Sequence, residues 1–180
     1  MIPKPIIPSA AWTGLRRPLL VALVLGCGMS LMDARVLTLR LALPTAFWWT
    51  YVPMVEILAL FAACPAARRA PSWPRIVDRY FMGHWPTLLW VMALAGCLAF
   101  IPPITVLSWQ QRISVPFDSA LLVIAWSAYI DFQFFRRGLK QSAWHAARDL
   151  LVQRAIAWTV GLTIFVGGAG YQTLAVRLGL

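Results

Sequence analysis

The sequence predicts an all-α protein, a polytopic bundle of about five transmembrane helices. Three observations lead to this fold class. The 180 residues are 61% apolar and only 12% charged, the mean hydropathy is +0.72, and apolar segments follow one another along the chain. Soluble domains are about a quarter charged, so this chain lacks the polar side chains needed to cover a water-exposed surface.

The apolar segments predict spans at about 18–37, 45–64, 85–106, 117–135 and 155–174. The first apolar run is short for a hydrocarbon core of roughly 30 Å. Its helix should therefore continue past Asp33 and Arg35, whose side chains reach the headgroups. The second span begins at an aromatic cluster, residues 47–51, which is typical of the membrane interface. Pro102 and Pro103 should end the third helix, because proline breaks a helix interior.

Lys and Arg are unevenly divided between the two sides of these spans. Three precede the first span, four lie between the second and third, and five lie between the fourth and fifth. The remaining connections and the tail carry two, one and one. The positive-inside rule then predicts a cytoplasmic N-terminus, an outer C-terminus and a multi-pass position in the inner membrane of a cell. Residues 1–17 would form a short cytoplasmic arm, disordered over residues 1–8, and residues 18–180 a single transmembrane domain.

The connection before the last span predicts a short interfacial helix. Gly138 can end the fourth span, and Ser142 can cap a new helix. Its apolar face would carry Trp144, Ala147 and Leu151, and its other face, towards water or headgroups, His145, Arg148 and Asp149.

The first span has an alternative interpretation as a lipoprotein signal peptide. Arg16 and Arg17 precede a short apolar core that ends at Gly26 and Cys27, which is the arrangement that such processing needs. Leu25 and the apolar residues after Cys27 argue against it. Cleavage would leave four spans in the same orientation. The other cysteines have no C-x-x-C spacing and predict packing residues rather than a zinc site or a disulfide framework.

Glu56 is the first candidate for a functional side chain, because it lies near the middle of the second span. An ionised acid at that depth costs roughly 2.5–3.5 kcal/mol on insertion scales, so it should face protein or a watery cavity. Ala59 and Ala63 follow on the same helical face, where small residues allow close helix contact. Glu56 could titrate a proton or coordinate a cation; the simpler interpretation is a protonated acid that bonds a neighbouring helix.

A second candidate site lies at the cytoplasmic interface. It consists of Ser127 and Asp131 on one face of the fourth span, with Arg136, Arg137 and His145 on the same side of the membrane. The favoured interpretation is an ion pair that holds a loop to the bundle, between Asp131 and one of the arginines predicted on that side; these are Arg75, Arg79, Arg136, Arg137 and Arg154. A phosphate or headgroup site is the alternative. In the last span, Ala157, Gly161 and Gly168 predict a helix-packing groove, within the bundle or between two copies.

Other chemistry finds little support in the sequence. Haem between spans needs histidines at membrane depth, and His84 and His145 are expected near or outside the cytoplasmic boundary. No catalytic, nucleotide-binding or metal motif is present, so no cofactor is predicted. The net charge of +10 favours anionic lipid headgroups as partners rather than nucleic acid, with protein subunits or a second copy as further partners.

Three classes of function remain. A non-catalytic subunit, scaffold or assembly factor of a membrane complex is favoured, so the sequence leans against enzymatic activity without deciding it. The alternative is a small transporter or channel component that uses Glu56 as a proton or cation site. The third is a membrane enzyme acting on lipid at the cytoplasmic face through Asp131, His145 and the arginine cluster.

Overall fold

The computed structural model describes residues 9–69, 72–100 and 109–178, with side chains described for residues 14–69, 72–100 and 116–168. The described residues form helices joined by short turns, without strands. Its elements are α1 (Ser9–Ala34), α2 (Leu39–Trp48), α3 (Tyr51–Ala63), α4 (Pro65–Arg68), α5 (Trp73–Met82), α6 (Trp85–Phe100), α7 (Trp109–Gln133), the π-helical turn η1 (Phe134–Gly138) and α8 (Ala143–Leu178).

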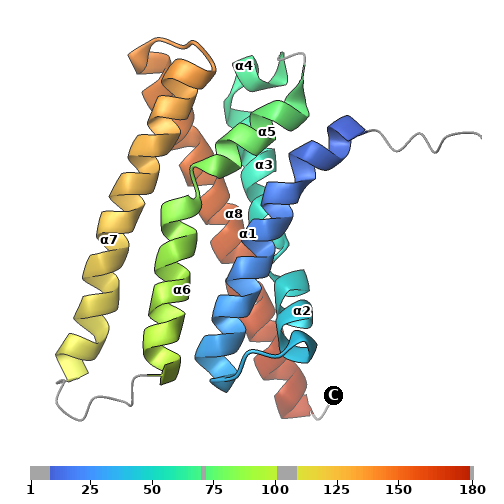
Figure 1. Ribbon diagram of the computed structural model, residues 1–180, viewed down its shortest axis with the longest axis vertical. Helices are drawn as coiled ribbons and strands as arrows, with labels where there is room; N and C mark the ends of the chain where they lie inside the picture. The colour runs from blue at the N-terminus through green and yellow to red at the C-terminus, as the bar shows by residue number, and fades with distance from the viewer. Residues whose placement is uncertain (1–8, 70–71, 101–108, 179–180) are drawn as a thin grey trace, which may run out of the picture.

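The long elements run alternately in opposite directions along one axis (Figure 1). Helix α1 begins near α5 and runs to the opposite end of the bundle. Helices α2 and α3 lead back, and α5 and α6 then run in the same direction as α1. Helix α7 then returns beside α6, and α8 packs along α3. The bundle is therefore an up-and-down arrangement in which neighbours in sequence are mostly neighbours in space.

Three helical segments are long and apolar enough to cross a membrane: Gly14–Ala34, Leu39–Ala63 and Ala143–Gly168. The α5–α6 pair is a fourth if its two helices, bent by 46° relative to each other, form one span. Helix α7 is not among these segments. The protein is thus all-helical, with three or four candidate membrane spans.

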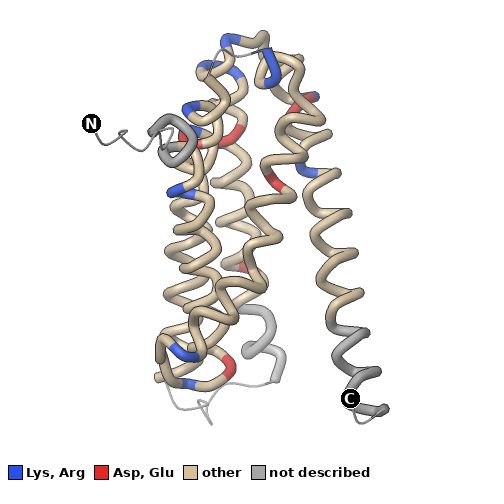
Figure 2. Tube along the Cα trace, turned by 90° about the vertical axis from the view of Figure 1, so that its right-hand side faces the viewer, with Lys and Arg blue, Asp and Glu red and all other residues tan. Residues whose placement is uncertain are grey.

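Most Lys and Arg residues of the described chain lie towards one end of the bundle, which we call the arginine-rich end (Figure 2). It is formed by α4, α5, η1 and the start of α8. Its basic residues are Arg68, Arg69, Arg75, Arg79, Arg136, Arg137, Lys140 and Arg148. The principal buried cluster lies in the same half of the molecule and includes Leu60, Val77, Tyr80, Phe135 and Ala146.

The second span is divided where the sequence predicts one uninterrupted helix. Helix α2 ends at Trp48 and α3 begins at Tyr51, so Pro53 falls in the first turn of α3. Proline is tolerated there because the first-turn N–H groups have no helical partner. The Thr50 hydroxyl donates to the carbonyl of Phe47 at 2.6 Å, which satisfies a carbonyl at the break.

The basic connection between the second and third predicted spans contains an amphipathic helix, α5, which the hydropathy of the sequence does not reveal. Val77, Tyr80 and Phe81 are buried on one face of α5, whereas Arg75 and Arg79 are exposed on the other. The strong amphipathic pattern allows this segment to lie against the bundle with its charges outward.

The separate interfacial helix before the last span is a wrong prediction. Helix α8 runs without interruption from Ala143 to Leu178. Ser142 does cap its start, since its hydroxyl accepts from the His145 N–H at 3.4 Å. The helix continues because no proline follows and the first glycine is Gly161. Asp149, expected to face water, is only 1% exposed because it pairs with Arg148 and Gln141.

Two further predictions concern parts of the chain that are not described. The disordered arm at residues 1–8 lies outside the described residues, although the helix already begins at Ser9, within the predicted arm of residues 1–17. The end predicted for the third span, including Pro102 and Pro103, also lies outside them; the described helix α6 ends at Phe100.

Candidate polar site inside the helix bundle

Glu56 lies on the face of α3 that packs towards the rest of the bundle, and its side chain is only 13% exposed. Ala59, one turn further on, is fully buried, and Ala63 is half-buried. The small side chain of Ala59 packs against Ala157 of α8, so the two helices approach closely beside the acid.

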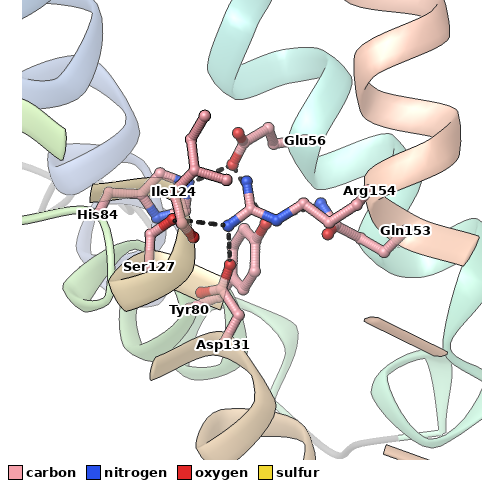
Figure 3. Close-up of polar contacts among 8 residues, drawn as sticks. All are labelled: Glu56, Tyr80, His84, Ile124, Ser127, Asp131, Gln153 and Arg154. Atoms are coloured by element: carbon pink, nitrogen blue, oxygen red, sulfur yellow. Dashed lines mark hydrogen bonds and ion pairs between the residues drawn. The ribbon is translucent and has the colours of Figure 1, made fainter. Parts of the chain in front are cut away.

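The carboxylate of Glu56 is held by two side chains of the α5–α6 region (Figure 3). Its Oε2 pairs with Nε2 of His84, and Tyr80 donates its hydroxyl to the same oxygen at 3.2 Å. His84 is buried and follows Gly83 at the bend between α5 and α6. The bend therefore aims the imidazole at an acid that precedes it by 28 residues.

Gly83 allows this bend to lie close to α7. A Cβ added at Gly83 would be 3.0 Å from Asp131 Oδ1 and 3.0 Å from Ile130 Cγ2. These distances are shorter than ordinary van der Waals contact. The absence of a side chain thus brings the two acids, Glu56 and Asp131, to opposite sides of the same junction.

Helix α8 contributes an adjacent amide and guanidinium to the junction. Gln153 donates from Nε2 to the Tyr80 hydroxyl oxygen at 2.8 Å. Arg154 pairs with Asp131 Oδ2 and donates to Ser127 Oγ at 3.4 Å. The Ser127 hydroxyl in turn donates to the Ile124 carbonyl at 3.1 Å, within α7. We refer to the seven residues Glu56, Tyr80, His84, Ser127, Asp131, Gln153 and Arg154 as the polar network.

The polar network is electrically neutral when it holds one shared proton. Asp131 and Arg154 cancel each other, and one proton between Glu56 and His84 leaves that pair with no net charge in either arrangement. Loss or gain of a proton would place a net charge inside the bundle, which a low-dielectric environment opposes. Neutrality is therefore the state that the surroundings favour.

Three polar atoms at the polar network are buried without a hydrogen-bond partner among the described residues: His84 Nδ1, Gln153 Oε1 and Arg154 Nε. Buried polar atoms are normally paired, with protein or with ordered water. Each of these three atoms could therefore make a further hydrogen bond beside the paired acids.

Comparison with known proteins identifies no relative. No protein-family model, curated protein or solved structure matches this chain.

The residues predicted for a cytoplasmic-interface site do not form one cluster. Ser127 and Asp131 meet Arg154 in the polar network. Arg136 and Arg137 are exposed on η1, where their side chains have no hydrogen bond or ion pair with any described residue. His145 lies at the start of α8, with Nδ1 2.7 Å from the Ser142 hydroxyl.

The predicted packing residues of α8 have three different environments. Ala157 is buried against Val55 and Ala59 of α3. Gly168 lies under the Trp48 ring, since an added Cβ would be 2.7 Å from Trp48 Cζ2. An added Cβ at Gly161 would meet nothing within 4 Å, so this position faces open space in the single chain.

A smaller polar cluster lies at the arginine-rich end, just beyond the end of the candidate span Leu39–Ala63. Gln141 donates from Nε2 to Cys64 Sγ at 3.3 Å and to Asp149 Oδ2 at 2.9 Å. Burial raises the pKa of the Cys64 thiol, which is therefore protonated and unreactive at neutral pH. Among the described residues, no three His, Cys, Asp or Glu side chains gather closely enough to hold a metal ion.

Three members of the polar network were not identified from the sequence: Tyr80, His84 and Gln153. Arg154 is one of five arginines that the sequence offers as partners of Asp131, and the structure pairs it with that acid. Tyr80 and His84 are four residues apart, and Gln153 and Arg154 stand at the edge of an apolar segment. Such polar residues at the margin of a span resemble ordinary headgroup-facing residues. Only the positions of α5 and α8 relative to α3 distinguish them.

Proposed function

We propose that this chain is a five-span protein of the inner membrane, with its N-terminus in the cytoplasm. The proposal adds α5–α6 and α7 to the three single candidate spans. Helix α7 has 25 residues, runs beside α6 and exposes Phe117, Leu122 and Trp126 as a lipid-facing helix would. The gathering of Lys and Arg at one end supports the orientation, because cytoplasmic connections carry the excess of basic residues.

Within that membrane, we propose the role of a non-catalytic subunit or scaffold of a membrane complex. The observation that carries this proposal is that the ionisable side chains inside the bundle are paired with one another. Two pockets lie among the described residues, one between α4 and the start of α8 and one between α1 and the α5–α6 bend, and no member of the polar network lines either of them. Side chains that could do chemistry are thus engaged in joining helices.

The polar network suits that role physically. Lipid tails are as apolar as leucine, so helices in a membrane are held together by close packing and hydrogen bonds rather than by hydrophobic burial. The polar network joins α3, α5, α7 and α8, which come from distant parts of the chain. It therefore holds the bundle in one arrangement that a partner could recognise.

The test is purification of the chain from native membranes, with identification of co-purifying proteins and measurement of their activity. Glu56→Gln should leave complex and activity close to wild type, because the amide oxygen still accepts from Tyr80 and His84. Glu56→Leu should lower stability by about 1–3 kcal/mol, because it leaves both donors unpaired. Asp118→Asn is the matched control, as Asp118 is an exposed acid on α7.

Two results would contradict this role. One is the absence of any reproducible partner in several detergents. The other is loss of the partner's activity in a Glu56→Gln chain that still folds and still joins the complex.

A second candidate function is a proton site in a small transporter or channel component. It is favoured by the proton shared between Glu56 and His84 and by the three buried polar atoms with spare capacity, which could hold water. Proteoliposomes loaded with a pH-sensitive dye should then show proton flux that Glu56→Gln abolishes and Asp118→Asn preserves. Flux that is equal in the wild type and Glu56→Gln would exclude this function.

A lipid enzyme is the least supported of the three classes. Its expected residues are engaged elsewhere, since Asp131 pairs with Arg154 and His145 contacts Ser142.

A further inference from the structure

A pocket of about 380 Å³ opens at the arginine-rich end, between α4 and the start of α8. It is separate from the polar network and is lined by eight residues: Pro65, Ala66, Arg69, Gln141, Ser142, His145, Arg148 and Asp149. A hollow of this size is large enough to admit a small polar group together with part of the molecule that carries it.

The residues that line the pocket supply positively charged hydrogen-bond donors. Arg69 is exposed, and its side chain has no ion pair or hydrogen bond with any described residue. Arg148 is 52% exposed and binds only one oxygen of Asp149, through Nε at 3.0 Å and Nη2 at 2.7 Å. Its Nη1 group and the second N–H of Nη2 have no partner among the described residues, so two guanidinium groups with available donors border the same hollow.

Asp149 offsets one of these two positive charges, because it lines the same pocket and pairs with Arg148, so the net positive charge of the lining comes from Arg69. The Asp149 side chain is 1% exposed, and both of its oxygens are occupied, one by Arg148 and the other by Gln141 Nε2 at 2.9 Å. A buried acid that holds an exposed guanidinium fixes the direction of the remaining donors. Asp149 is thus a positioning residue for Arg148.

The start of α8 adds further donors. The Ser142 oxygen accepts from the His145 N–H at 3.4 Å and lies 2.7 Å from His145 Nδ1. When the hydroxyl donates to Nδ1, the imidazole carries its proton on Nε2 and can donate it to a ligand. The dipole of this helix of 36 residues also favours an anion at this end.

We propose that this pocket binds a phosphate group, carried either by an anionic membrane lipid or by a soluble phosphoester. Planar guanidinium groups match phosphate oxygens in pairs, and serine, imidazole and helix-end donors commonly complete such sites. The pocket lies at the end of the bundle where headgroups would be within reach, which makes both sources compatible with its position.

The test measures binding to the purified full chain in two arms. In the first, inorganic phosphate and glycerol 3-phosphate are titrated in detergent by calorimetry at constant ionic strength. In the second, native mass spectrometry records retention of phosphatidylglycerol against diacylglycerol, which has the same tails but no phosphate. Binding in the first arm identifies a soluble ligand, and binding in the second arm alone identifies a lipid headgroup; both results support the proposal.

Arg69→Ala is the decisive variant, because the Arg69 side chain makes no hydrogen bond or ion pair with any described residue. We expect binding about tenfold weaker, the usual loss for one charge-assisted contact. Arg68→Ala is the matched control, since Arg68 is an adjacent, exposed arginine that does not line the pocket, and it should bind like the wild type. Arg148→Lys keeps a charge beside Asp149 and should weaken binding without unfolding the chain.

The proposal is overturned if neither arm shows binding. It is also overturned if Arg68→Ala and Arg69→Ala weaken binding equally, because general charge attraction would then explain the affinity.

Discussion

The pairing of Asp131 with Arg154 is the contact on which the junction between α7 and α8 depends most. Asp131 is 1% exposed, so its charge has almost no access to solvent. A buried ion pair adds little net stability compared with well-packed apolar residues, whereas removal of one partner leaves an uncompensated buried charge. The two residues should therefore be strongly coupled.

We predict that Arg154→Met lowers the free energy of unfolding by about 3–5 kcal/mol. The double variant with Asp131→Asn should recover most of that loss, because no buried charge is then left unpaired. Unfolding in detergent with increasing dodecyl sulfate measures both. Arg16→Ala serves as the control, since Arg16 is 58% exposed in its pair with Asp78 and should cost less than about 1 kcal/mol. Additive effects of the two substitutions would contradict the coupling.

Among the helices, close approach depends on where glycine lies rather than on how many glycines there are. Gly26 of α1 faces the backbone of α2, and an added Cβ would lie 2.4 Å from the nitrogen of Ala46. The backbone of α2 would have to move to admit it. A Cβ added at Gly161 of α8 would meet nothing within 4 Å, so the same change there meets no obstacle in the single chain.

We predict opposite effects of alanine at these two positions. Gly26→Ala should destabilise the protein by about 1–3 kcal/mol through overpacking. Gly161→Ala should stabilise it by up to about 1 kcal/mol through the higher helix propensity of alanine. Thermal unfolding in detergent, with size-exclusion chromatography of each variant, measures the outcome. Loss of stability together with loss of an oligomer in Gly161→Ala would instead show that Gly161 contacts a second copy.

The whole bundle consists of helices that run in alternate directions, and its orientation in the membrane can be tested by labelling single cysteines. In a cysteine-free background, Val36→Cys lies between α1 and α2, and Lys140→Cys lies between η1 and α8. Both positions are exposed. We predict that a membrane-impermeant maleimide labels position 36 from outside intact spheroplasts, and position 140 only after permeabilisation. Labelling of both positions in the same compartment would contradict the proposed topology.

Much of the fold was accessible from local sequence patterns. Apolar segments identify the helices because each membrane-spanning segment must pair its backbone N–H and C=O groups internally and present apolar side chains to lipid. The arginine-rich end follows from the positions of Lys and Arg along the chain. Glu56 is recognisable as an acid in an apolar segment, with Ala59 on the same face. The length of α8 was missed because a polar start and an apolar continuation look like two elements when they are one.

The partners of Glu56 and Asp131 could be learned only from the tertiary structure. His84 lies 28 residues from Glu56, and Gln153 lies 73 residues from Tyr80. Hydropathy reports how deep a residue lies, but not which helices are neighbours or how each is rotated about its axis. Those relations come from side-chain packing between distant segments, such as Ala59 on Ala157 and Gly83 beside Asp131. The same packing brings Arg69 and Arg148 to the borders of one pocket.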